Sequence, residues 1–271
     1  MPQTMTLFTN QLAREPAVLV TVASTQGSAP REAGAWMAVF AHNMLGTVGG
    51  GRLELEAIAE ARRFLAAHQS EAVRRFSLGP SLGQCCGGVV QLRFEFVDGS
   101  DVAALTERLA PRLAPLALFG GGHVGQALVN ALAPLPFAVR WIDSRDEIFP
   151  AQLPSNVACE HSDPVHAAVR DLPPGSRVLI MSFSHAEDLD VVAACLRRLR
   201  ELDDLPYIGL IGSASKWATF GHRLDERGFS STERARVTCP IGVAGIHGKQ
   251  PEVIAASVAA QILLVAPPHA P

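Results

Sequence analysis

Residues 116–125 read Leu-Ala-Leu-Phe-Gly-Gly-Gly-His-Val-Gly, and this stretch decides the fold of the second half of the chain. A short apolar run ends on the pattern G-x-G-x-x-G, formed by Gly120, Gly122 and Gly125, and a helical pattern follows directly. Asp143 closes the next apolar run, eighteen residues past Gly125. A glycine turn between a strand and a helix, with an acidic residue near that spacing, predicts a Rossmann-type nucleotide or phosphate-binding domain.

Each glycine of the motif has a physical role. Gly120 allows the tight turn, Gly122 lets backbone N–H groups approach a phosphate, and Gly125 permits close packing of the helix. The helix begins at His123, and its N-terminal end stabilises negative charge. The alternative is a Rossmann domain that retains the turn for structural reasons and binds no dinucleotide.

Two charged residues follow the second strand. Asp143 is expected to accept hydrogen bonds from a ribose. Arg145 either binds an additional phosphate or is a solvated surface residue.

Short apolar runs alternate with helical patterns from residue 116 onward, which is typical of βαβ units and a parallel sheet. The predicted strands are 116–119, 139–142, 157–160, 178–182 and 207–211, and the predicted helices are 123–132, 165–171, 189–199, 216–227 and 251–264.

The first part of the chain shows a different pattern. Two strands, 18–22 and 35–40, flank a polar turn; a helix begins after Gly49, Gly50 and Gly51, and strict alternation over 90–96 predicts a half-buried strand. We therefore expect an N-terminal α/β domain (1–100), a linker (101–115) and a C-terminal Rossmann-like, doubly wound parallel-sheet domain (116–271).

Composition narrows the class of protein. The 271 residues are 48% apolar and 18% charged, with a formal net charge of −3, so the chain is globular and has no field that would attract nucleic acid. Residues 1–16 lack the pattern of a secretory signal, and the longest apolar run, 253–266, is too short to span a membrane. We expect a cytoplasmic protein with no membrane partner.

Five cysteines, an odd number, do not form a disulfide framework. Cys85 and Cys86 lie in the glycine-rich stretch 79–88, where a thiolate stays accessible, and we interpret this pair as functional. Cys159 and Cys195 lie in apolar elements and are interpreted as structural. The spacing does not favour a closed zinc site, but a metal bound through sulfur at Cys85 or Cys86 stays open.

Two further groups of residues are candidates. Glu54, in the first turn of the helix after Gly51, either helps to cradle a polar ligand or complements the helix dipole. His185 follows a predicted strand and is either a general acid or base, with Asp188 nearby, or an exposed histidine beside the helix cap Ser184.

These motifs resemble the XdhC/CoxI family, accessory proteins of molybdenum hydroxylases such as xanthine dehydrogenase, over essentially the whole chain. The resemblance is carried by segments 27–34, 48–54, 83–88, 119–125, 184–188, 209–216 and 239–242.

The resemblance implies a chaperone without turnover of its own. Such a protein binds the molybdenum cofactor (molybdopterin), protects it while its terminal sulfido ligand is installed, and delivers it to the cofactor-binding subunit of a hydroxylase; a cysteine desulfurase is the implied sulfur donor. We expect the cofactor in a cleft between the domains, with Cys85 or Cys86 near the molybdenum. The expected cofactor-binding residues are Gly49, Gly50, Gly51, Glu54, Gln84, Cys85, Cys86, Gly87, Gly120, Gly122, His123, Gly125, Asp143 and His185.

Other functions stay open from the sequence alone. A nicotinamide-dependent oxidoreductase would use Asp143 for the ribose and His185 for proton transfer, so the Rossmann crevice holds the pterin, a nucleotide or nothing. A redox sensor would use Cys85 and Cys86 without a cofactor. Apolar helix faces make a homodimer a reasonable expectation.

Overall fold

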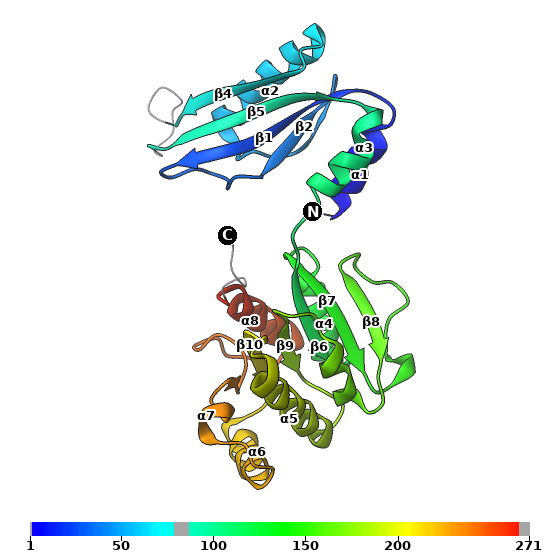
Figure 1. Ribbon diagram of the computed structural model, residues 1–271, viewed down its shortest axis with the longest axis vertical. Coiled ribbons are helices and arrows are strands. Elements are labelled where there is room, and N and C mark those ends of the chain that lie inside the picture. The colour runs from blue at the N-terminus through cyan, green and yellow to red at the C-terminus, as the bar shows by residue number, and fades with distance from the viewer. Residues whose placement is uncertain (1, 79–86, 266–271) are drawn as a thin grey trace. The chain divides into compact units, whose positions relative to one another are not determined.

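A computed structural model describes residues 2–78 and 87–265 of the chain (Figure 1). It consists of two compact units, residues 1–111 and 112–271. The predicted linker 101–115 contains the helix α3 (Val102–Arg108), whose Leu105 is buried in the first unit against Phe8 and Leu12. The second unit's first strand, β6, begins at Ala114.

The first unit is built on a five-stranded antiparallel sheet with the order β3-β2-β1-β5-β4. Its elements are α1 (Pro2–Leu12), β1 (Ala17–Gln26), β2 (Trp36–Val39), β3 (Met44–Gly46), α2 (Gly51–Ala67), β4 (Glu71–Ser77), β5 (Val89–Val97), the short 3₁₀ helix η2 (Gly99–Asp101) and α3.

Helices cover both faces of this sheet. Side chains alternate along β1, so successive residues pack against opposite layers. Val18, Val20 and Val22 pack with the apolar face of α2, including Phe64. Leu19, between them, points to the other side, where α1 and α3 pack. The sequence pattern predicted β1, β2, α2 and β5 and missed α1, β3 and β4. The edge strand β4 is mostly exposed, so it lacks the apolar alternation that identifies a strand.

The second unit is a six-stranded, all-parallel sheet with the order β11-β10-β9-β6-β7-β8. Its strands are β6 (Ala114–Phe119), β7 (Phe137–Asp143), β8 (Val157–His161), β9 (Arg177–Ile180), β10 (Tyr207–Leu210) and β11 (Val237–Thr238). The helices are α4 (His123–Leu132), η3 (Asp146–Ile148), η4 (Val165–Asp171), α5 (His185–Leu202), α6 (Ala214–Glu226), α7 (Ser231–Arg234) and α8 (Pro251–Leu263).

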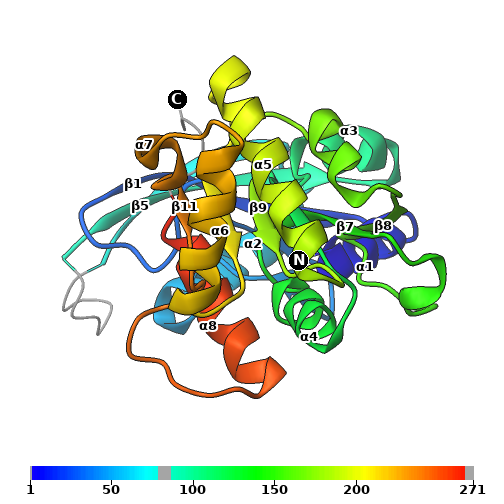
Figure 2. The same cartoon turned by 90° about the horizontal axis from the view of Figure 1, so that it is seen from below.

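The strand order reverses between β6 and β9, which are neighbours in the sheet but lie far apart in sequence. The chain starts in the centre at β6, runs to one edge through β7 and β8, and returns to the other side of β6 through β9. Figure 2 shows α4 and α8 on one side of these strands and α5 on the other, in agreement with the two core clusters. In doubly wound sheets, ligands bind in a crevice at the carboxyl ends of the strands, beside the point where the strand order reverses.

The α/β class and the Rossmann-like parallel sheet are confirmed, with local corrections. The predicted strand 178–182 ends at Ile180, because the N–H of Ser182 turns to the carboxylate of Asp188. Segment 165–171 is a 3₁₀ helix, and the two-residue strand β11 and the helix α7 were not predicted.

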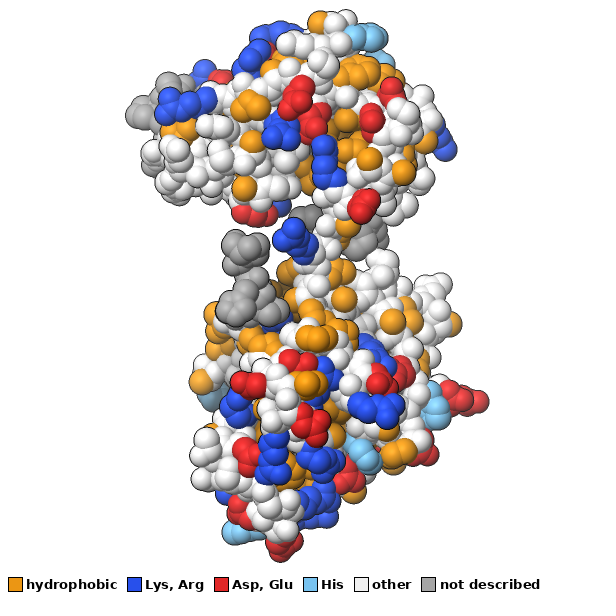
Figure 3. All heavy atoms as spheres, in the orientation of Figure 1, with side chains coloured by type: hydrophobic (Ala, Val, Ile, Leu, Met, Phe, Trp, Pro, Cys, Tyr) orange, Lys and Arg blue, Asp and Glu red, His pale blue; other side chains and the backbone are white. Residues whose placement is uncertain are grey.

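Basic and acidic side chains are interspersed on the visible face of each unit, without a large field of one sign (Figure 3). Within the described ranges, no helix combines the length and the apolar character needed to cross a bilayer.

Candidate functional site

The turn between β6 and α4 is held by two glycines that have no room for a side chain. Gly120 has a φ of 121°, and a Cβ there would lie 2.0 Å from the carbonyl oxygen of Met181 on the neighbouring strand end. A Cβ on Gly125 would lie 2.1 Å from the carbonyl oxygen of Gly120. These two residues make the turn and the close helix packing possible, as the motif predicts.

Gly122 is different, because a Cβ there would meet no atom within 4 Å. Gly122 is the N-cap of α4, its φ is −69°, and no side chain caps the helix. Gly122 and His123 are exposed, so the start of the first turn, at the positive end of the helix dipole, is accessible to solvent. This arrangement suits an anion such as a phosphate.

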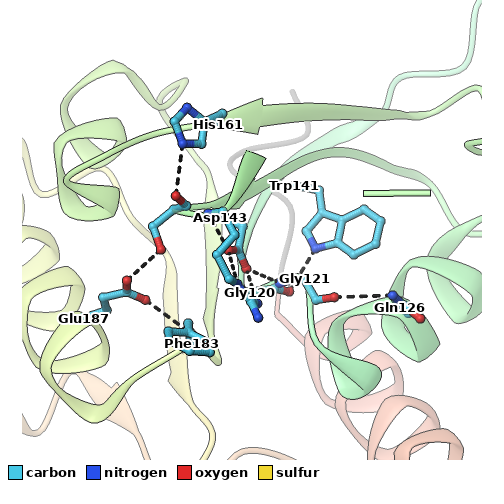
Figure 4. A network of polar contacts seen from close by, with 10 residues as sticks. Gly120, Gly121, Gln126, Trp141, Asp143, His161, Phe183 and Glu187 are labelled. Atoms are coloured by element: carbon cyan, nitrogen blue, oxygen red, sulfur yellow. Dashed lines mark hydrogen bonds and ion pairs between the residues drawn. The ribbon is translucent and has the colours of Figure 1, made fainter. Parts of the chain in front are cut away.

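Asp143, at the end of β7, supports the turn from the adjacent strand (Figure 4). Its side chain is 1% exposed, and Oδ2 accepts a hydrogen bond of 2.6 Å from the N–H of Gly121. Oδ1 accepts from the backbone N–H and Nε of Arg145, and Oδ2 also accepts from Nη2 of Arg145, each at 2.9 Å. The carboxylate thus links the glycine turn to the loop after β7.

Burial by itself raises the pKa of Asp143, but hydrogen bonds from Arg145 and from the N–H of Gly121 outweigh it, so the pKa lies below its usual value. The hydrogen bond to Asp143 raises the pKa of Arg145, with a further contribution from the nearby charge of Glu187. Both side chains are therefore charged at neutral pH.

Residues after β9 complete this edge of the sheet. The Arg145 guanidinium lies over the ring of Phe183, 4.4 Å from its centroid, and Phe183 is 66% exposed. Glu187 accepts hydrogen bonds from the hydroxyl of Ser144 (2.7 Å) and the N–H of Phe183 (3.1 Å), as Figure 4 shows. Sequence reasoning missed Phe183 and Glu187; the signal was their position directly after a strand that borders the crevice.

A buried ion pair lies farther along the same edge. Lys216 donates to Oδ2 of Asp188 at 2.6 Å and to the carbonyl oxygen of Ile211 at 2.8 Å. The second oxygen of Asp188 is used by the N–H of Ser182, so the pair ties the ends of β9 and β10 together. His185 is exposed at the start of α5, with its ring edge toward Phe220, and the polar partner expected for it, Asp188, is engaged elsewhere.

In the first unit, the loop before α2 is held by hydrogen bonds to the carboxylate of Glu54. Oε2 of Glu54 accepts from the N–H of Val48 (3.0 Å) and of Gly50 (3.1 Å), as well as from the hydroxyl of Thr47. Gly49 and Gly50 have positive φ, as does Gly51. Glu54 therefore holds the loop that precedes α2, and its predicted role in cofactor binding stays a prediction.

The predicted residues Gln84, Cys85 and Cys86 lie outside the described residues. Gly87 is described, and a Cβ there would meet no atom within 4 Å. Cys195 is fully buried, which raises the pKa of its thiol to about 12 and confirms its structural character. Cys159 is partly exposed, and burial raises its pKa as well.

The structure brings Gly120, Gly122, His123, Gly125 and Asp143 together in the second unit, whereas Gly49, Gly50, Gly51 and Glu54 form a separate cluster in the first. Two cavities of about 490 and 510 Å³ in the second unit are lined by none of the predicted site residues. Residues 2–78 and 87–265 contain no group of three His, Cys, Asp or Glu side chains arranged to hold a metal.

The reversed strand order and the glycine turn between β6 and α4 define a Rossmann-type domain. Comparison with known proteins gives the family: residues 116–262 match the XdhC Rossmann domain, and residues 11–77 match the XdhC and CoxI family. The chain belongs to the XdhC family.

Two similar proteins are a curated sequence and a solved structure. The uncharacterized protein YqeB of Escherichia coli K12 is 29% identical over 274 residues, which cover 96% of this chain and 46% of that protein. The chain thus spans about half the length of this curated relative. A crystal structure described as a xanthine dehydrogenase from Bacillus halodurans has the same fold, with a TM-score of 0.77 and 19% identity over 97% of this chain and 95% of that one.

Proposed function

We propose that this protein is an accessory factor that binds the molybdenum cofactor, protects it during sulfuration, and delivers it to xanthine dehydrogenase or a related molybdenum hydroxylase. Family membership supports the maturation role, because models of the family match both halves of the chain. The observation that carries the binding step is the open, uncapped amide group at Gly122.

The phosphate end of the cofactor fits this turn. The N-terminal amides of α4 donate to phosphate oxygens, and the space beside Gly122 is free of protein atoms within 4 Å of a Cβ position. Gly120 and Gly125 shape the turn, and Asp143 holds it through the N–H of Gly121. The loop around Gly50 is a weaker candidate for this role, since Glu54 already accepts from its amides.

The metal end is assigned to Cys85 and Cys86, whose thiolates are soft ligands suited to molybdenum. The bound cofactor would supply the redox and oxygen-transfer chemistry of the client hydroxylase. This chain's own residues bind the phosphate, hold the turn and shield the metal. A cysteine desulfurase is the sulfur donor in this proposal.

The alternative, a nicotinamide-dependent oxidoreductase, receives less support from the geometry. Its ribose acceptor would be Asp143, whose two oxygens already accept four hydrogen bonds from within the protein. Its proton donor would be His185, which is exposed.

The test is cofactor retention. The full chain is co-expressed with a molybdenum-cofactor supply, purified, and analysed for molybdenum and pterin. We expect near-stoichiometric cofactor in the wild type and activation of an apo-hydroxylase. Cys85→Ala and Cys86→Ala, singly and together, should lower molybdenum content.

Gly122→Ala tests the phosphate end, because its methyl group would occupy the space beside the amides. We expect cofactor loss with an unchanged fold, checked by circular dichroism. Gly99→Ala is the matched control: a Cβ there makes ordinary contacts of 3.6 Å or more in the first unit. A wild-type chain that never carries the cofactor would refute the proposal.

A further inference from the structure

In Rossmann domains, a carboxylate at the end of the second strand commonly accepts a hydrogen bond from a ribose. In this chain that carboxylate, Asp143, already accepts hydrogen bonds from the protein itself. An ionised carboxylate has about four lone-pair sites. In Asp143 all four have donors: the backbone N–H and Nε of Arg145 at Oδ1, and the N–H of Gly121 and Nη2 of Arg145 at Oδ2. A ribose 2′-hydroxyl arriving at this strand end finds no free carboxylate oxygen.

The crevice presents the outer edge of Arg145 instead. The guanidinium is fixed on two sides, by the paired hydrogen bonds to Asp143 and by the ring of Phe183 beneath it. Its side chain is 35% exposed, and within the described part of the chain Nη1 donates to no partner. A guanidinium is a donor without acceptor capacity, and its planar fork matches the geometry of phosphate.

The surroundings keep this edge in place. Glu187 is the other charged group near Arg145, and both of its oxygens are engaged, by the hydroxyl of Ser144 and the N–H of Phe183. These bonds join the loop after β7 to the loop after β9. His161 adds a contact of 3.0 Å from Nε2 to the carbonyl oxygen of Ser144. The platform of Arg145 and Phe183 is thus held from the ends of both β7 and β9.

We propose that the crevice binds a nucleotide with a 2′-phosphate in preference to the same nucleotide with a free 2′-hydroxyl, and that Arg145 determines this specificity. The 5′-phosphate takes the same amides beside Gly122 that the proposed function gives to the pterin phosphate, so the two ligands exclude each other there, and the 2′-phosphate accepts from Arg145. Asp143 is a positioning residue that fixes the guanidinium. The inference concerns binding alone and does not depend on the cofactor-carrier role.

Two small nucleotides isolate the contribution of the 2′-phosphate to binding. 2′,5′-ADP and 5′-AMP differ only in the 2′-phosphate, and their affinities for the full wild-type chain are measured by isothermal titration calorimetry at low salt. We expect 2′,5′-ADP to bind about tenfold tighter or more, the ratio that one charge-assisted hydrogen bond supplies. NADP⁺ and NAD⁺ should show the same order. Equal affinities, the reverse order, or no saturable binding of 2′,5′-ADP would overturn the proposal.

Arg145→Ala tests the residue. It removes the phosphate donors and frees lone pairs on Asp143, so the ratio of the two affinities should fall to about one or invert. The control is Arg170→Ala, since Arg170 is also an arginine paired with an aspartate but its side chain is 87% exposed and contributes nothing to the crevice. An unchanged ratio in Arg145→Ala would assign the selectivity elsewhere and contradict the proposal.

Arg145→Gln provides a second variant with a long, uncharged side chain, in case the alanine variant does not fold. The comparison of 2′,5′-ADP with 5′-AMP on the wild-type chain tests the preference without any variant. The probes contain neither pterin nor molybdenum. Failure here therefore leaves the cofactor-carrier proposal standing, and failure to retain the cofactor leaves this one standing.

Discussion

The two glycine turns of the molecule, one before α2 and one before α4, solve the same electrostatic problem in opposite ways. Each leads directly into a helix whose first amides have no partner within the helix. In the first unit Glu54, from the helix itself, folds back onto the amides of Val48 and Gly50. Neither N-cap, Gly50 or Gly122, has a side-chain cap, but Glu54 takes the N-cap amide of Gly50, whereas Asp143, from the next strand, takes the amide of Gly121 before the N-cap.

The position of the carboxylate decides what the turn can bind. Glu54 places a negative charge where an external anion would lie, so the first turn is complete without a ligand. Asp143 accepts from Gly121, behind the turn, and leaves the helix amides beyond Gly122 open. Glycine content alone does not distinguish a phosphate site from a capped loop; the source of the nearest carboxylate does.

The largest expected effect is on the backbone of the second turn. Gly120→Ala would place a Cβ 2.0 Å from a backbone oxygen of Met181 and force a positive φ on alanine. We expect a loss of about 3 kcal/mol in the free energy of unfolding, because β9 must shift. Urea unfolding followed by circular dichroism measures it. Gly99→Ala, with ordinary contacts, should change stability by less than about 0.5 kcal/mol; similar values for both would show that the turn is not constrained.

The next effect tests whether Glu54 acts as the anion of the first turn. Glu54→Ala removes the acceptor of two amides and a hydroxyl and should cost about 2 kcal/mol. The emptied turn should then bind inorganic phosphate, so phosphate should raise the melting temperature of the variant more than that of the wild type. Glu56→Ala is the control, because Glu56 pairs with the exposed Arg52 on the same helix and accepts from none of the described amides of the loop before α2. If phosphate does not raise the melting temperature of Glu54→Ala more than that of the wild type, Glu54 does not take the place of an external anion.

Asp143→Asn should cost about 1 to 2 kcal/mol at pH 7, since it weakens the hydrogen bonds of Arg145 and of the Gly121 amide. The folded pKa of Asp143 lies below its unfolded value of about 3.9. Its stabilising contribution is therefore complete above that value and is lost as the pH falls through the folded pKa. The difference between the unfolding free energies of wild type and variant should begin to shrink only below about pH 4 and vanish below the folded pKa. A difference that persists in acid would mean that the charge of Asp143 is not what stabilises the turn.

The sequence predicted the turn at Gly120 and the acidic residue that ends β7. The strand–turn–helix geometry of the motif places both residues at a characteristic spacing in the sequence. It did not predict that Arg145 saturates Asp143, or that Phe183 lies beneath the guanidinium. Those contacts join residues on separate strand ends, and no spacing rule connects them. The role of Glu54 was ambiguous for the same reason: an acidic residue in a first turn has the same spacing whether it binds a ligand or caps the loop.

Weakly patterned elements were missed for a related reason. The edge strand β4 buries little of either face, and β11 contains only two residues, so neither shows a period that a sequence reveals. Strong predictions came from the buried central strands, where apolar runs are bounded by glycine. The parallel sheet followed from the βαβ pattern, and of its two outermost strands β8 was predicted and β11 was not.

Among the variants of the two turns and their carboxylates, Gly122→Ala has the smallest expected change in stability, and it separates structure from binding most directly. The residue has a φ of −69°, which alanine adopts without strain, and a Cβ meets no atom within 4 Å. The cost should be about 0.5 kcal/mol, because alanine is a poorer N-cap than glycine. The methyl group nevertheless narrows the space beside the helix amides. Phosphate should raise the melting temperature of the wild type and have a smaller effect on this variant, with Gly99→Ala behaving like the wild type. An equal phosphate effect in all three chains would place the bound anion away from the start of α4, and the contrast between the open and the filled turn would then have no functional meaning.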